Sequence, residues 1–120
     1  MEKPIANNFQ VEKYRHDLEV IHNTAKQIIK DFELFGIEIS FSGNEQTAYS
    51  ELKEQLIPVL SKLYKNKPSV FNSLLYRIDV SEKKLNAILN NFSADERSGQ
   101  LANLIIEREF MKVLTKKFFS

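Results

Sequence analysis

The 120-residue sequence contains no cysteine. The chain therefore has no disulfide, no thiolate chemistry and no zinc site of the common sulfur-rich kind. It also lacks a long apolar run: residues 1–10 carry charge and asparagine where a secretory signal is apolar, and no stretch approaches the roughly 18 apolar residues of a membrane span. We expect a cytoplasmic protein that makes no contact with a membrane.

Net charge and glycine are scarce as well. Lysine and arginine number 17 against 16 acidic residues, so the net charge of +1 gives no global field for a polyanion, and binding one requires a local patch. The three glycines, Gly36, Gly43 and Gly99, form no phosphate-binding loop, and no glycine-flanked serine or acid–histidine–nucleophile arrangement occurs. The sequence predicts neither an enzyme nor a cofactor.

The composition that remains is that of an ordinary globular protein. Hydrophobic residues make up 42% and charged residues 28% of the chain. A length of 120 residues is close to the commonest domain size, so we expect a single helical domain over residues 1–120.

The strongest pattern predicts a long first helix over residues 9–35. Apolar side chains recur there in alternating steps of four and three, which puts them on one face: Tyr14, Leu18, Ile21, Ala25, Ile28, Phe32 and Phe35. Asn7 or Asn8 can cap the start, and Gly36 can adopt the left-handed conformation at the end.

Residues 37–42 alternate between apolar and polar side chains, as a half-buried strand does. No partner strand follows in the sequence, so the backbone groups of a lone strand would stay unpaired. Two interpretations remain: an extended connector that lies over the helices, which we favour, or one half of a pairing with a second copy of the chain.

Four more helices are predicted after this connector. The second begins at Asn44 with a core face of Ala48, Leu52, Leu56, Val59 and Leu63, and Pro58 predicts a kink or break near residues 55–57. The third begins at Pro68 with a stripe of Val70, Phe71, Leu74, Leu75 and Ile78. The fourth runs from Ser81 to Asn90 and Asn91 with Leu85, Ile88 and Leu89 inward, and the fifth runs from a capping box at residues 93–96 to about Phe118. The predicted fold is an all-α antiparallel bundle of about five helices with one short extended connector at 37–42.

The last helix is apolar on two sides. Leu101, Leu104, Ile105 and Met111 cover one side, and Ala102, Ile106, Phe110, Val113 and Phe118 cover much of the other. Such a helix is either central in the bundle or shared with a partner. Because a small bundle has difficulty surrounding it, we favour a homodimer or other partner interface, formed by Ile37, Ile39, Phe41, Ile106, Phe110, Val113 and Phe118.

Arg108 lies in the middle of one of those apolar sides and needs a carboxylate or a cluster of carbonyl groups as its partner. We choose Asp79, which follows an apolar run at a helix junction, whereas Arg77 flanks the same stripe on its opposite side. The favoured interpretation is a structural ion pair or an arginine that reaches solvent, and the alternative is an arginine that receives an anionic ligand.

Two further sequence motifs, one for metal binding and one for DNA binding, are incomplete. Glu19 and His22 have the spacing of a carboxylate-bridged metal bundle, but no second copy follows and His16 is six residues away, so no metal site is predicted. Two short helices and a long one, from Val70 or Ser81 onward, resemble a helix-turn-helix in order only. The long helix begins with Asp95 and Glu96 and alternates in sign, and the patch of Lys112, Lys116 and Lys117 suits a helix end.

The function predicted by elimination is a non-enzymatic protein-interaction or structural module that self-associates or binds another protein. The alternative is a small nucleic-acid-binding or regulatory protein with a helix-turn-helix-like C-terminal half.

Overall fold

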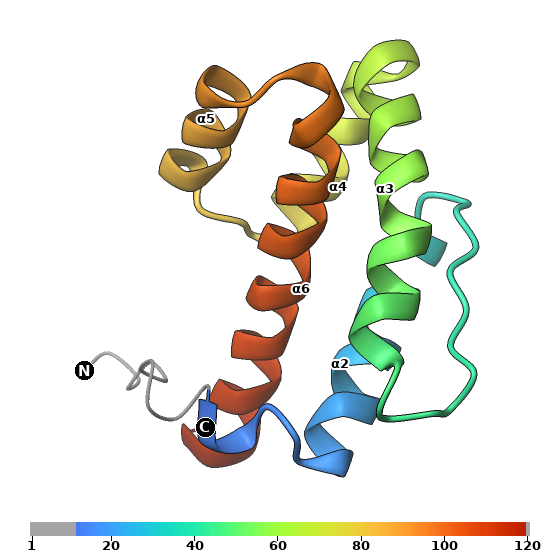
Figure 1. Ribbon diagram of the computed structural model, residues 1–120, viewed down its shortest axis with the longest axis vertical. Helices are drawn as coiled ribbons and strands as arrows, with labels where there is room; N and C mark the ends of the chain where they lie inside the picture. Colours follow the sequence, from blue (N-terminus) through green and yellow to red (C-terminus); the bar gives the residue numbers. More distant parts are fainter. Residues whose placement is uncertain (1–11, 120) are drawn as a thin grey trace.

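The computed structural model describes residues 12–119, and these form an all-α fold without strands (Figure 1). A short helical turn at residues 12–14 precedes five helices: α2 (Leu18–Glu33), α3 (Ala48–Asn66), α4 (Pro68–Ile78), α5 (Glu82–Asn91) and α6 (Ala94–Phe119). The predicted all-α bundle is confirmed.

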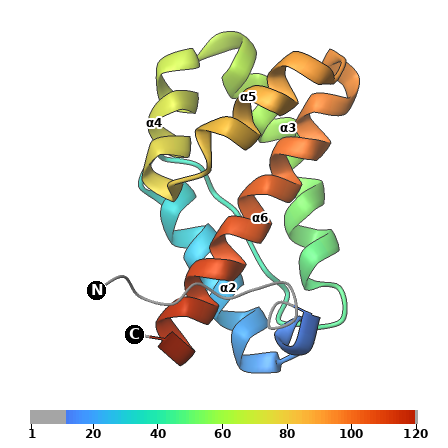
Figure 2. The same cartoon turned by 90° about the vertical axis from the view of Figure 1, so that its left-hand side faces the viewer.

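Helix α6 lies at the centre of the arrangement and contacts α2, α3, α4 and α5 (Figures 1 and 2). Both of its apolar sides are therefore covered by the same chain. The buried side chains are Leu101, Ala102, Ile105, Ile106, Phe110 and Leu114. The expectation that one small bundle leaves a side of this helix uncovered is wrong, because four helices surround it.

The main core is built from α2, α3, α4 and α6, with Ile39 of the connector closing one edge. Its largest buried side chains include Phe32, Leu56 and Leu74. A second, smaller cluster of Val20, Phe110 and Leu114 joins the start of α2 to the end of α6. The two ends of the described chain therefore meet at the same end of the molecule.

Helix α2 begins at Leu18 and not near residue 9. The Asp17 carboxylate accepts a hydrogen bond of 3.1 Å from the Val20 N–H and so caps the helix. Because Tyr14 lies in the preceding turn, the predicted stripe fails at its start: Leu18 is 58% exposed, and Val20 and Thr24 are buried instead. The proposed caps Asn7 and Asn8 lie outside the described residues.

The predicted end of this helix is confirmed. Gly36 has φ of +74°, and its N–H donates to the Glu33 carbonyl at 2.9 Å. The Ile37 N–H donates to the Phe32 carbonyl at 3.1 Å, which completes a Schellman motif.

Residues 37–42 form an extended connector, as favoured. Side chains of α3 satisfy its backbone: the Ser40 N–H donates to Gln55 Oε1 at 2.9 Å, and Gln55 Nε2 returns a bond of 2.7 Å to the Ser40 carbonyl. The Ser42 N–H donates to Glu51 Oε1 at 3.0 Å. One amide side chain thus replaces the partner strand that the sequence lacks.

Helix α3 differs from the prediction at two points. Asn44 caps a turn, where its Oδ1 accepts from the Gln46 N–H at 3.0 Å, and the helix itself starts at Ala48. The helix then runs unbroken through Pro58, so of the predicted kink or break the break is wrong, and the kink stays a prediction. Leu60 is fully buried, whereas Val59 is only partly buried.

Helices α4 and α5 begin where the sequence predicts, and the Ser81 side chain caps α5 by accepting from the Lys84 N–H at 3.3 Å. Helix α5 buries none of its own residues, so Leu85, Ile88 and Leu89 are only partly covered. At the start of α6 the Ser93 carbonyl accepts from the N–H groups of Glu96 and Arg97. The two side-chain bonds of the predicted capping box do not form between Ser93 and Glu96.

Candidate functional site

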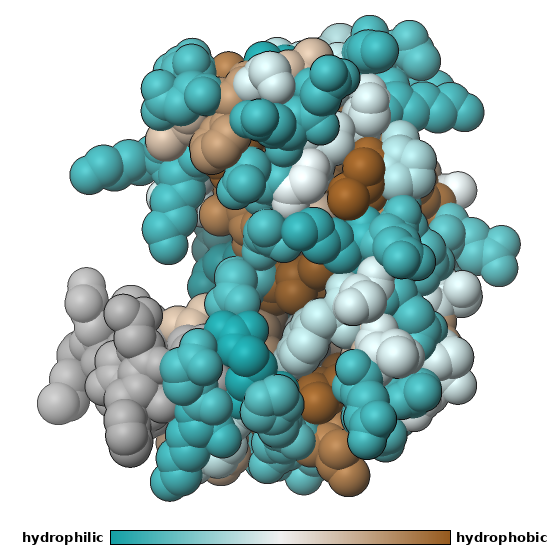
Figure 3. Space-filling view, viewed as in Figure 1, coloured by the Kyte–Doolittle hydropathy of each residue, from teal (hydrophilic) through white to brown (hydrophobic). Residues whose placement is uncertain are grey.

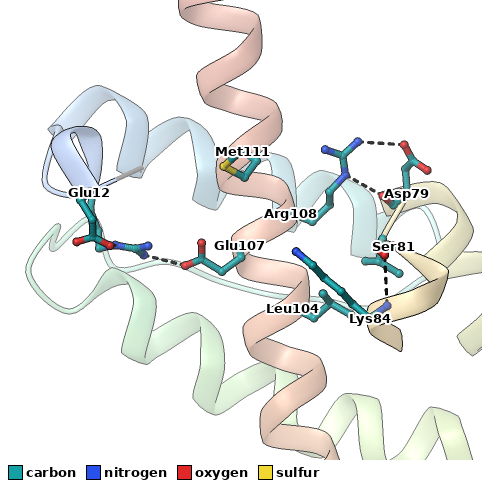
Figure 4. A pocket seen from close by; sticks show the side chains of 10 residues that line it. Glu12, Asp79, Ser81, Lys84, Leu104, Glu107, Arg108 and Met111 are labelled. Carbon is teal, nitrogen blue, oxygen red and sulfur yellow. Dashed lines mark hydrogen bonds and ion pairs between the residues drawn. The ribbon is translucent and has the colours of Figure 1, made fainter. Parts of the chain in front are cut away.

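The junction between α4 and α5 faces the middle of α6 across an open cleft of about 520 Å³ (Figure 4). Its floor is apolar and its rim is charged. The lining residues are Glu12, Arg15, Asp79, Val80, Ser81, Lys84, Leu104, Glu107, Arg108 and Met111. This cleft contains the ion pair that the sequence predicts.

Arg108 and Asp79 are paired as predicted. Arg108 Nη2 lies 3.0 Å from Asp79 Oδ2, and Arg108 Nε donates to the Asp79 carbonyl at 2.8 Å. The Asp79 backbone has φ of 65° at the end of α4, so its carbonyl and carboxylate both face α6. The pair is not buried, because the two side chains are 35% and 79% exposed. It holds the α4–α5 junction against α6 from the surface.

Two further cations line the same cleft. Arg15 Nη1 pairs with Glu107 Oε1 at 2.8 Å, and this hydrogen bond raises the pKa of Arg15 above its ordinary value. The Lys84 side chain extends from α5 across the cleft toward α6 and makes no ion pair with any residue of the described chain (Figure 4). Three cations and three anions line the cleft, so it has no excess charge to attract an anion.

Arg77 lies away from this cleft and contacts a group of buried charges that the sequence analysis missed. Its Nε lies 3.6 Å from Oδ1 of Asp31. The Asp31 and Glu109 side chains are 1% and 0% exposed. Lys112 Nζ approaches both, at 3.8 Å from Asp31 and 2.5 Å from Glu109, and also donates to the Ile78 carbonyl at 3.1 Å. These contacts join α2, α4 and α6.

The two buried acids differ in their affinity for protons. Burial raises the pKa of Glu109 to about 8, and the neighbouring Asp31 carboxyl adds to this effect against the charge of Lys112. Burial also opposes the ionisation of Asp31, but hydrogen bonding to Glu109 and Gln27 and the charges of Lys112 and Arg77 lower its pKa below the ordinary value. At neutral pH the pair therefore holds one proton on Glu109 and one negative charge on Asp31.

The spacing of these acids carried a signal. Asp31 follows Ile28 by three residues and Glu109 follows Ile106 by three, which places each on a buried side of its helix. In the sequence, Glu109 belongs to a run of alternating charge with Glu107 and Arg108, which hides its position on a buried side of the helix.

The predicted interface residues are mostly used inside the chain. Ile39, Ile106 and Phe110 are buried in the core, so they cannot contact a second copy without opening it. Ile37, Phe41 and Val113 are partly buried, and Phe118 is 40% exposed and stacks on Tyr14. On the face seen in Figure 3, apolar surface is limited to small areas separated by polar side chains.

The histidine motif is dispersed. His22 Nε2 lies 2.8 Å from Glu45 Oε1, while Glu19 Oε2 binds Lys117 Nζ at the same distance. Within the described part of the chain, no group of three or more histidine or acidic side chains is placed to hold a metal ion.

The most exposed large apolar side chain in the described residues belongs to Tyr76, which is 88% exposed. It stands on α4 at the side of an open groove of about 760 Å³ between α4 and α5. Leu75, Val80 and Leu85 supply the apolar part of this groove. Sequence analysis missed Tyr76 because it interrupts no pattern on its own helix.

Comparison with protein-family models, curated proteins and solved structures found no match to this chain. None of the helices in residues 12–119 is long and apolar enough to cross a membrane. Inferences about function therefore rest on the chain's own side chains.

Proposed function

We propose that this chain is a non-enzymatic interaction module that forms a homodimer through the groove between α4 and α5. The observation that carries the proposal is the exposure of Tyr76, 88% of which faces solvent on a helix whose opposite face is core. Each Å² of apolar area that leaves water on binding contributes about 25 cal/mol to the free energy of association. A partner that covers the Tyr76 ring therefore gains a large contribution from it.

The groove and the ring suit a second copy of the same chain. A two-fold interface requires one surface to carry both a projecting group and the recess that accepts it. Tyr76 and the recess lined by Val80 and Leu85 lie side by side, so each ring of a dimer has the partner's groove to enter. Because the ring and the recess lie on the same surface, two copies can fill each other's recess at once. This gives a closed dimer and not an open filament.

The charges around the groove are compatible with this arrangement. Asp79 and Glu82 line the groove, and Lys83 is exposed next to Glu82 at the start of α5, so the surface around the groove offers charges of both signs. In a two-fold pair each can approach its opposite on the other copy. The proposal keeps the predicted cytoplasmic location, which is supported by the lack of cysteine.

The test is sedimentation equilibrium of the purified chain and of a Tyr76→Ser variant. We expect a reversible dimer for the unchanged chain, with a dissociation constant that hardly varies with salt because apolar contact dominates. Tyr76→Ser is expected to weaken dimerisation by at least about 30-fold, which corresponds to about 2 kcal/mol for an aromatic residue at the centre of an interface.

Leu34→Ser is the matched control, since Leu34 is 59% exposed at the end of α2, outside the groove. This variant should dimerise as the unchanged chain does. A monomer at all concentrations, or equal weakening by the two substitutions, would overturn the proposal.

A further inference from the structure

A second groove, of about 390 Å³, runs between α2 and the last turns of α6. It is lined by Glu19, Asn23, Lys26, Gln27, Lys30, Val113, Lys116 and Lys117. Four lysines stand against one glutamate, a net charge of +3 in a chain whose total is +1. All residues outside this groove therefore sum to −2, and the positive field of the molecule is concentrated here.

Two of these lysines are available to a ligand. Lys26 and Lys30 are exposed, and neither side chain makes an ion pair or hydrogen bond with any residue in the described part of the chain. They lie one turn apart on α2, a rise of about 6 Å along the helix axis. Lys117 is different, because it binds Glu19 at 2.8 Å and also lies 3.8 Å from Asp17.

The floor between the lysines is polar. Asn23 and Gln27 are partly buried there, and Gln27 Nε2 is held by a hydrogen bond of 3.0 Å to Asp31 Oδ1. Lysine together with asparagine and glutamine is the combination that contacts phosphate and sugar in nucleic-acid complexes. The groove is thus lined by hydrogen-bonding groups along its length.

The shape and composition of the groove determine which phosphate ligand it suits. It is open, and its cations stand on flexible stems along its two sides, so it does not enclose a single small anion as a P-loop does. An extended polyanion gains from several such weak contacts at once. No aromatic side chain lines the groove, so bases have no stacking surface there.

From this arrangement we infer that the groove between α2 and α6 binds the phosphate backbone of a nucleic acid without regard to sequence. The lysines supply the contacts and the amides fix the position of the strand. This surface differs from the helix-turn-helix arrangement considered from the sequence, since the recognition element would be the seam between the first and last helices of the described chain.

The experiment is fluorescence anisotropy of a labelled DNA duplex titrated with the full chain at several salt concentrations. With Lys26 and Lys30 each contacting a phosphate, the logarithm of the binding constant is expected to fall with the logarithm of salt with a slope of about −2, and the dissociation constant near physiological salt to be about 10⁻⁴ M. A second duplex of unrelated sequence should bind equally well.

The decisive variant is Lys26→Glu with Lys30→Glu, which reverses two charges on exposed side chains that make no hydrogen bond or ion pair with the rest of the described chain. Loss of two contacts should reduce the magnitude of the slope by about 2 and weaken binding at least about tenfold. Lys62→Glu with Lys65→Glu changes the net charge equally on exposed positions of α3 and should leave most of the binding intact. Circular dichroism of both variants checks that they fold.

Three results would overturn the inference: no binding at low salt, equal weakening by the two double variants, or binding to phosphatidylserine vesicles without binding to DNA. A competition experiment with inorganic phosphate distinguishes a polyanion site from a small-anion site. Phosphate that replaces chloride at equal ionic strength should displace the duplex only weakly. Strong competition would identify a small-anion site and would also overturn the inference.

Discussion

A carboxylic acid that is buried beside a carboxylate stays uncharged at neutral pH, and Glu109 meets both conditions. One Asp31 oxygen and both Glu109 oxygens accept no aligned hydrogen bond from the described residues. Glu109 Oε1 nevertheless lies 2.5 Å from Lys112 Nζ, and a proton on the Glu109 carboxyl turns one of its acceptors into a donor toward Asp31, which lowers the cost of burying the two acids side by side.

This proton makes stability depend on pH. The pKa of Glu109 is 4.5 in the unfolded chain and about 8 in the folded chain, so the folded state binds the extra proton in between. The free energy of unfolding should therefore fall as pH rises through that range, by at most about 1.4 kcal/mol per pH unit. Asp31 acts oppositely, because its lowered pKa contributes stability that is lost as pH falls below 3.8.

Glu109→Gln tests the assignment, since glutamine keeps a donor and cannot ionise. Urea unfolding between pH 5 and 8 should show a smaller decline for Glu109→Gln than for the unchanged chain, and a more stable variant at the upper end. Glu96→Gln, at an exposed position, should retain the original slope. If all three proteins share one slope, Glu109 does not carry the proton.

The ion pair of Arg108 and Asp79 contributes much less to stability than a buried pair would. Because the side chains are 35% and 79% exposed, solvent screens their attraction, and we expect Arg108→Met to lower the free energy of unfolding by about 1 kcal/mol or less. A double-mutant cycle with Asp79→Asn measures the coupling by chemical denaturation. A loss of several kcal/mol would show that the pair is as costly to break as a buried one.

At the residue scale, the sequence predicted this pair because both partners interrupt apolar runs. It did not predict the Asp31–Glu109 contact, since each acid sits within a run of charged and apolar neighbours. Which helices meet decides whether two such acids become neighbours, and periodicity within one helix contains no information on that.

At the element scale, α3 retains a proline that its own helix does not need. Pro58 has no N–H to donate to the Glu54 carbonyl, yet the helix is continuous, and Leu56 and Leu60 on either side of the proline are both fully buried in the core. Pro58→Ala restores the missing bond at an exposed position and should raise the free energy of unfolding by about 1–3 kcal/mol. Thermal unfolding measures it; a lower melting temperature would mean that the proline's restriction of the unfolded chain outweighs the bond.

Helix boundaries were predictable where a short-range signal acts alone. Gly36, Pro68 and Ser81 mark ends that the structure confirms. The start of α2 was not predictable, because the apolar spacing of the helix continues back through residues 12–17. The helix nevertheless begins after Asp17, whose side chain caps it. Similarly, Asn44 has a side chain suited to capping a helix, but it caps a turn and lies four residues before Ala48, where α3 begins.

At the scale of the whole molecule, the two proposed surfaces lie on different pairs of helices. Tyr76 and its groove belong to α4 and α5, whereas the basic groove belongs to α2 and α6. A dimer through the first surface would carry two copies of the second. Two weak phosphate-binding grooves on one particle bind a long nucleic acid more tightly than either groove alone, provided that the strand spans them.

The central place of α6 also determines when the chain can fold during synthesis. Helices α2 and α3 cover their apolar faces chiefly against α6, which is synthesised after them. Until then the nascent segments hold exposed apolar faces with no native partner, a state that chaperones recognise and that invites aggregation. A product that stops before Leu101 would lack the residues that fill the middle of the core.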